Sequence, residues 1–235
     1  MKNHIRKNEK IMVWQVVEMV SKEQLVEITE LSIDKMVKTF KQSPYFFYTE
    51  SDFHCYLYYE ILHKLSLENL QCETKDKKQS ILLHKEYPTK ERYSANDLAV
   101  VEKGSRGHFD LCIWNPEKTK EKRFRAESTD FGEEQHTFIA IEFDLIERNR
   151  SLEQALHHVE WDLLKLRSGK NEVEHGYSLL FVRDWKHRKR FQEKIGPAVA
   201  KGENIVVLYV EKDNDDRIIK TLSQKPFLDY EHHFK

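Results

Sequence analysis

The chain has 235 residues, of which 39% are hydrophobic and 34% are charged, and its formal net charge is -1. This length and composition fit one domain with one core. The near-neutral charge excludes attraction to nucleic acid through a global positive field, so any contact with phosphates must come from local basic surface.

The cysteines and the N-terminal stretch predict a cytoplasmic protein without a membrane span. The sequence contains no C-x-x-C pair of the kind that would indicate zinc or redox chemistry. We expect reduced thiols at the widely separated Cys55, Cys72 and Cys112. The apolar stretch from Ile11 to Val20 contains Gln15 and Glu18, which makes it a poor signal-peptide core. It is also far too short to cross a bilayer.

Two helices are predicted first in chain order. Ser21 and Gln24 form a capping-box pattern, and apolar residues recur at helical spacing as far as Phe40. Ser43-Pro44 ends this helix, because proline disfavours a helical residue before it. A second helix opens at Thr49, with a buried stripe of Phe53, Leu57, Ile61 and Leu65. The aromatic residues from Tyr45 to Tyr59 could stack on bases, but at helical spacing core packing is the favoured interpretation.

Strands and helices then alternate. The strand-like runs are Ile81 to Tyr87 (ended by Pro88), Gly107 to Trp114, Thr137 to Leu145, Tyr177 to Val182 and Asn204 to Val210. Helices are predicted over Ser151 to Leu166 and Trp185 to Ala198, and the charged stretch from Glu117 to Glu134 reads as a hairpin loop. The order α-α-β-β-β-α-β-α-β predicts an α/β domain with a mixed sheet between helices. We divide it into a helical N-terminal extension (1–42), an α/β core (43–212) and an unassigned tail (213–235).

Carboxylates interrupt two of the most apolar strands. Asp110 lies within Phe109-Asp110-Leu111-Cys112-Ile113, and Glu142 and Asp144 follow Ile139-Ala140-Ile141. Side chains two apart on a strand share a face, so Glu142 and Asp144 should point the same way. Carboxylates on a central strand are costly unless they are paired or bind a cation, and oxygen ligands suit Mg²⁺.

The order of these residues resembles the restriction-endonuclease-like fold of the PD-(D/E)XK nuclease superfamily. Glu50 opens an early helix, a strand carries Asp110, and the next strand carries Ile141-Glu142-Phe143-Asp144, followed by a helix and a strand. The resemblance covers roughly Pro44 to Val210 and rests on a short, degenerate motif. It implies that Asp110 and Glu142 hold Mg²⁺ or Mn²⁺, that Glu50 supports the ion, and that the ion activates a water for attack on a phosphodiester.

One position departs from the superfamily pattern. Where the pattern has a lysine two residues after the glutamate, this chain has Asp144. Candidates for a cation supplied from elsewhere are Lys85, Lys165, Arg148 and Arg106, and Lys165 is attractive because it follows Asp162 by one helical turn. The predicted catalytic set is therefore Glu50, Asp110, Glu142, Asp144 and Lys165.

Each of these acids also has a purely structural interpretation. Asp110 and Glu142 could cap strand ends and pair with Arg106 or Arg148. Glu50 could be a helix-start carboxylate favoured by the dipole, and Asp144 could pair with Arg148. His108 shares a strand face with Asp110, and we interpret it as incidental.

Two basic groups are candidate phosphate contacts. The run from Arg183 to Lys194 includes Arg188 and Lys189, although a solvated helix face is the default interpretation of such a run. Lys85, Lys90 and Arg92 form the second group, near the predicted site.

The sequence leaves more than one function open. The first is a Mg²⁺-dependent nuclease acting on DNA, for which a homodimer would be typical of the superfamily. The second is a catalytically degenerate member of the same fold that binds nucleic acid or protein, motivated by the missing lysine and the neutral charge. A different α/β enzyme is disfavoured because the sequence has no Gly-rich phosphate loop or nucleophile elbow.

Overall fold

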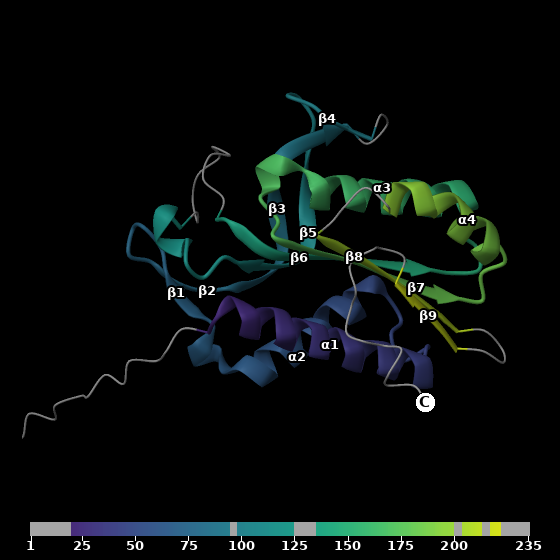
Figure 1. The fold of residues 1–235 in the computed structure, drawn as a ribbon, viewed down its shortest axis with the longest axis horizontal. Helices are drawn as coiled ribbons and strands as arrows, with labels where there is room; N and C mark the ends of the chain where they lie inside the picture. Colours follow the sequence, from purple (N-terminus) through teal and green to yellow (C-terminus); the bar gives the residue numbers. More distant parts are fainter. Residues whose placement is uncertain (1–19, 95–97, 125–134, 200–203, 213–216, 222–235) are drawn as a thin grey trace, which may run out of the picture.

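A mixed, seven-stranded sheet in the order β4-β3-β5-β6-β7-β8-β9 forms the centre of the protein. In this computed structural model the structure describes residues 20–94, 98–124, 135–199, 204–212 and 217–221. Helices α3 and α4 cover one face of the sheet, and α1 and α2 cover the other (Figure 1). The chain is thus an α/β protein with a mixed sheet flanked by helices, as the sequence predicts.

The parallel half of the sheet consists of β6 (Thr137–Ile146), β7 (His175–Arg183) and β8 (Ile205–Lys212). Two crossover helices connect these strands, α3 (Leu152–Arg167) and α4 (Arg188–Val199). Every residue of β6 is buried, because parallel strands with helices on both faces have no solvent side. The last strand, β9 (Arg217–Thr221), adds antiparallel to β8.

An antiparallel arm forms the other half, from β3 (Leu83–Ser94), β4 (Ala99–Val100) and β5 (Ser105–Trp114). The prediction that Pro88 ends the strand is wrong, since β3 continues to Ser94. Pro88 is tolerated because the β3–β5 register shifts between Pro88 and Arg92, which is where a strand can accommodate proline. Strands β1 (Gln71–Glu73) and β2 (Gln79–Ile81) form a separate two-stranded sheet.

Helices α1 (Lys22–Gln42) and α2 (Glu50–Asn69) pack against each other, and α1 also contacts β8. The predicted capping box of α1 is present: Ser21 Oγ accepts from the Gln24 backbone N–H at 3.2 Å, and Gln24 Oε1 accepts from the Ser21 N–H at 3.0 Å. Phe40 of α1 packs edge-on against Phe181 of β7, with ring centroids 5.0 Å apart. The helix that we assigned to an extension therefore contributes to the same core as the sheet.

Most elements lie within a few residues of their predicted positions. Helix α4 begins three residues later than expected, and the short 3₁₀ turns η1 (Thr119–Glu121) and η2 (Gly169–Asn171) were not anticipated. Strands β1, β2, β4 and β9 were also missed. Part of the predicted loop over 117–134 and most of the predicted tail over 213–235 lie outside the described residues. The stretch before Val20 also lies outside them. None of the helices in the described part is long and apolar enough to cross a membrane.

The two halves of the sheet separate where β5 meets β6. Their antiparallel ladder runs only from Leu111 opposite Ile141 to Trp114 opposite Thr137, although both strands continue beyond it. Past this point β3 and β5 rise beside one end of α3 and leave the plane of the other strands (Figure 1). One further step of the ladder would set Asp110 opposite Glu142. We call this divergence the acidic fork, defined by Glu50, Asp110, Glu142 and Asp144.

Candidate active site

Two predicted carboxylates occupy the edge of β6 that β5 leaves unpaired. Asp110 Oδ2 accepts from the Phe143 backbone N–H at 2.7 Å, and Glu50 Oε1 accepts from the Leu145 N–H at 3.2 Å. These acids take the place of ladder hydrogen bonds, which explains how β6 remains an extended strand beyond the fork. The carboxylates of a distant helix and a neighbouring strand are thereby brought to the same short stretch of β6.

Glu142 lies between these edge contacts and is paired with Lys165. Its side chain is 1% exposed, and its Oε1 lies 2.8 Å from Lys165 Nζ. Lys165 Nζ also lies 2.9 Å from Asp162 Oδ1 and donates to the His108 carbonyl at 3.1 Å. Burial raises the pKa of Glu142 well above its usual range, and the charge of Lys165 only partly offsets this. Burial alone would lower the pKa of Lys165, but the neighbouring Glu142 and Asp162 outweigh this and raise the pKa above its usual value. The ammonium is therefore protonated.

Asp144 shares the α3 side of β6 with Glu142, as the two-residue spacing predicts, whereas Phe143 stacks on Phe53 of α2. Asp144 Oδ1 accepts from Arg150 Nη1. Its Oδ2 is buried and has no hydrogen-bond partner among the described residues. Burial raises the pKa of Asp144 to about 7, although His158 and Arg150 both act to lower it. An unsatisfied carboxylate oxygen in the interior is costly and favours a cation nearby.

Asp110 faces a histidine on the α2 side. Its Oδ2 lies 3.5 Å from Nε2 of His54, whose Nδ1 lies 3.7 Å from Glu86 Oε1. Burial would raise the pKa of Asp110, but His54, the Phe143 N–H and Lys165 together hold it below its usual value. Asp110 is therefore ionised at neutral pH, and at 21% exposed it is more accessible than the buried Glu142 and Asp144.

Two groups of carboxylate and imidazole side chains bring one ligand atom each to within 4.8 Å of one another. The first is Glu50 with Asp144 and His158, and the second is Asp110 with His54 and Glu86. The predicted metal ligands thus border one stretch of β6 but do not form one group. Glu50 belongs to the first group and Asp110 to the second, whereas Glu142 belongs to neither and is paired with Lys165. The oxygen-rich donors, the unpartnered Asp144 Oδ2 and the excess of acids over cations fit a hard divalent ion.

Of the candidate cations, Lys165 is placed against the acids in the part of the chain that the structure describes. Lys165 pairs with Glu142, whereas Lys85 and Arg148 are exposed and Arg106 donates to the Thr89 carbonyl. The expected alternative pairing of Asp144 with Arg148 is wrong, because Arg150 makes that contact. The β6–α3 loop carries Arg148 outward and turns Arg150 back toward the sheet, where the Arg150 carbonyl accepts from Trp185 Nε1 at 2.8 Å.

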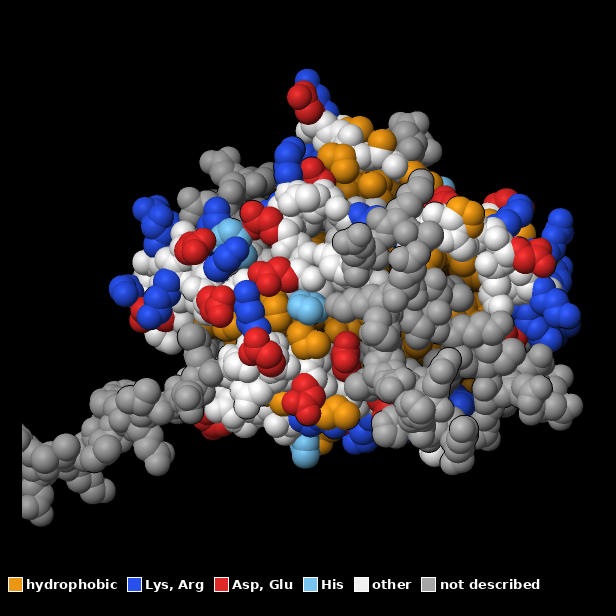
Figure 2. Space-filling view, in the orientation of Figure 1, with side chains coloured by type: hydrophobic (Ala, Val, Ile, Leu, Met, Phe, Trp, Pro, Cys, Tyr) orange, Lys and Arg blue, Asp and Glu red, His pale blue; other side chains and the backbone are white. Residues whose placement is uncertain are grey.

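The predicted phosphate contacts are scattered. Lys90 pairs with Glu172, Arg92 Nη1 donates to the Gly104 carbonyl at 2.9 Å, and Arg188 Nε lies 3.0 Å from Glu211 Oε1. Lys85 and Lys189 are exposed. Lys and Arg side chains gather at the right-hand end of the molecule, next to α4 (Figure 2).

Several site residues were not assigned a role from sequence. His54, Glu86, Arg150 and His158 reach the acids through contacts that are distant in the chain or that depend on a loop. One signal was available: His158, Asp162 and Lys165 recur at helical spacing beside the apolar Ala155, Val159 and Leu166. Polar residues that interrupt the buried stripe of a helix indicate a polar site beneath it.

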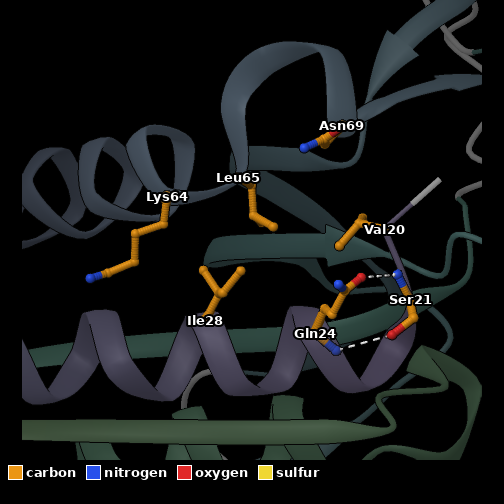
Figure 3. Close-up of a pocket in the computed structure, with 7 residues that line it drawn as sticks. All are labelled: Val20, Ser21, Gln24, Ile28, Lys64, Leu65 and Asn69. Carbon is orange, nitrogen blue, oxygen red and sulfur yellow. Dashed lines mark hydrogen bonds between the residues drawn. The ribbon is translucent and has the colours of Figure 1, made fainter. Parts of the chain in front are cut away.

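A separate hollow lies between the start of α1 and the end of α2. It measures about 570 Å³ and is lined by Val20, Ser21, Gln24, Ile28, Lys64, Leu65 and Asn69. Figure 3 shows these side chains converging from the two helices, with the Ser21–Gln24 capping box at its rim. Lys64 lies roughly 20 Å along the helix from Glu50, so this hollow is not part of the acidic fork.

Comparison with known proteins adds no relative. No family model matches the chain, and no significant match was found among curated proteins or solved structures.

Proposed function

We propose that the protein is a metal-dependent phosphodiesterase with a restriction-endonuclease-like fold, acting as a nuclease on DNA with Mg²⁺ or Mn²⁺. The observation that carries this proposal is the acidic fork. Four carboxylates border one unpaired stretch of β6, and a protonated lysine lies 2.8 Å from the central one, Glu142. An acid cluster with a single buried lysine suits phosphodiester hydrolysis, in which negative charge must be both attracted and stabilised.

Each acid has a distinct part in this proposal. Glu50, Asp110 and Glu142 would have to be brought together to hold the ion, because Glu50 and Asp110 belong to separate ligand groups and Glu142 is paired with Lys165. When bound, the ion would polarise a phosphoryl oxygen and lower the pKa of its water. Asp110 is ionised and partly exposed, so it can bind a cation without a large change in protonation. Glu142 needs a positive neighbour to ionise, because burial raises its pKa.

Lys165 supplies the charge that the motif lysine would give. Asp162 and the His108 carbonyl hold its ammonium group in place, so its position is fixed by α3 and β5 rather than by β6. A cation held there orients Glu142 and offsets negative charge on a bound phosphate. On this basis Asp144 does not replace the lysine and instead holds Arg150 near the fork.

A cleavage assay tests the proposal. Glu142→Gln keeps the size of the side chain and removes its charge, and it should lower Mn²⁺-supported cleavage of plasmid and single-stranded DNA by on the order of 100-fold or more. Glu68→Gln is the matched control, because Glu68 is an exposed acid near the far end of α2. Circular dichroism would verify that both variants fold. Cleavage that survives Glu142→Gln at the wild-type rate would refute the assignment.

A second candidate, a binding module without catalysis, is favoured by one specific observation. Arg150 pairs with Asp144 and Lys165 pairs with Glu142, so the two buried acids on β6 are already partly neutralised by protein groups. Calorimetric titration with Mn²⁺ separates the two candidates, since the module predicts normal folding without a divalent-ion site.

A further inference from the structure

Three aromatic rings are exposed in the connection between α1 and α2, residues 43–49, which we call the aromatic loop. Tyr45 is 64% exposed, Phe46 63% and Tyr48 83%. The expectation that the aromatic residues from Tyr45 to Tyr59 pack in the core holds for Phe47 and Phe53 but not for these rings. Monomeric proteins rarely group exposed large apolar side chains, and such groups mark interaction surfaces.

The backbone beneath these rings is held in place. Arg183 Nη1 donates to the Pro44 carbonyl at 3.2 Å and to the Phe47 carbonyl at 2.8 Å. Phe47 stacks on Phe53 of α2 with ring centroids 4.2 Å apart and planes 11° from parallel. The exposed rings are therefore presented on an ordered support, which lowers the entropic cost of binding a flat ligand.

The aromatic loop lies between the acidic fork and a basic surface. On one side, Tyr48 precedes Glu50 by two residues, and Glu50 contacts the edge of β6. On the other side, Tyr45 Oη donates to Asp184, at the end of β7. The chain continues from there through buried Trp185 to the exposed Lys186, Lys189, Arg190 and Lys194. Lys189, Arg190 and Lys194 belong to α4, and Lys and Arg side chains gather at the end of the molecule next to this helix (Figure 2).

We infer that the aromatic loop stacks unpaired bases of a single-stranded nucleic acid, with the basic residues from Lys186 to Lys194 contacting its phosphates. This inference rests on the proposed function for the direction of the strand, toward the fork. Every base has a face that can stack on an aromatic ring, but in a duplex these faces are occupied by neighbouring base pairs. Exposed rings flanked by positive charge thus suit a single strand or a frayed end better than an intact duplex.

Fluorescence anisotropy in EDTA tests this without any cleavage. The probes are a labelled 12-nucleotide oligothymidylate and a labelled duplex of the same length. Wild-type protein should bind the single strand more tightly than the duplex, and the affinity should fall as salt rises. Phe46→Ala and Tyr48→Ala should each weaken single-strand binding roughly tenfold, while Tyr48→Phe should retain it, because stacking needs the ring and not the hydroxyl.

Tyr59→Ala is the matched control. Tyr59 is 59% exposed on α2, outside the loop, and its removal should leave affinity unchanged. Equal binding by wild type and Tyr48→Ala would overturn the inference, and so would an equal loss of affinity in Tyr59→Ala. If the wild-type protein did not bind the single strand, the inference would also be wrong, and the aromatic loop would instead be a surface for a protein partner. Duplex cleavage without a preference for binding single strands would contradict the inference and leave the proposed function intact. Single-strand binding through Tyr48 without metal-dependent cleavage would support the inference and contradict the proposed nuclease activity.

Discussion

The two halves of the sheet differ in how deeply their acidic side chains are buried and in what those side chains contact. The parallel half is buried throughout β6, so every charge within it needs a partner, and Glu142 and Asp144 find Lys165 and Arg150. The antiparallel arm is partly exposed, and its acids Asp110 and Glu86 both lie within 4 Å of His54, with Asp110 also accepting from the Phe143 N–H. The candidate site lies at the acidic fork, where the buried acids paired with Lys165 and Arg150 meet the more accessible Asp110.

The largest contrast between the halves should come from removing one lysine in each. Lys165→Met would leave Glu142 and Asp162 buried without their cation, and we expect a loss of about 3–5 kcal/mol in the free energy of unfolding. Lys90→Met removes the pairing with Glu172, which is 46% exposed, and should cost less than about 1 kcal/mol. Urea denaturation at pH 7 measures both. Similar losses for the two variants would mean that burial does not distinguish these halves.

The halves should also respond to pH with opposite sign. In the parallel half, burial raises the pKa of Asp144 from 3.8 to about 7 in the folded protein. Folding therefore favours the protonated form, so this contribution to stability is complete below pH 3.8 and is lost as pH rises through 7. Asp144→Asn mimics the neutral form, and relative to wild type it should gain up to about 4 kcal/mol between pH 4 and pH 8. Parallel stability curves for the two proteins would contradict this.

In the arm, burial lowers the pKa of His84 from 6.5 to about 4, and its ring stacks on Trp114 with centroids 3.9 Å apart. The neutral imidazole is favoured in the folded state, so its contribution is complete above pH 6.5 and is lost as pH falls through 4. His84→Phe should abolish up to about 3 kcal/mol of this acid-induced loss. Denaturation curves at pH 4 and pH 7 measure it, and an unchanged acid sensitivity in the variant would refute the assignment to His84.

How much of this was predictable depends on the range of each interaction. The capping box of α1, the buried run of β6 and the shared side of Glu142 and Asp144 follow from local patterns, and the structure confirms them. The continuation of β3 across Pro88 depends on a register shift against β5, which local patterns do not reveal. The pairing of Asp144 with Arg150 instead of Arg148 depends on how the β6–α3 loop turns. Site residues were thus predictable where strand periodicity positions them and not where distant elements meet.

The proposed function requires a divalent cation to bind at the acidic fork. Calorimetric titration of Mn²⁺ into the protein at pH 8 tests it most directly, with Asp110→Asn combined with Glu142→Gln as the disrupted variant and Glu68→Gln as the control. We predict saturable binding to wild type and to Glu68→Gln that is lost in the double variant while its fold persists. Absence of binding to the wild-type protein, or equal binding by the double variant, would contradict the account.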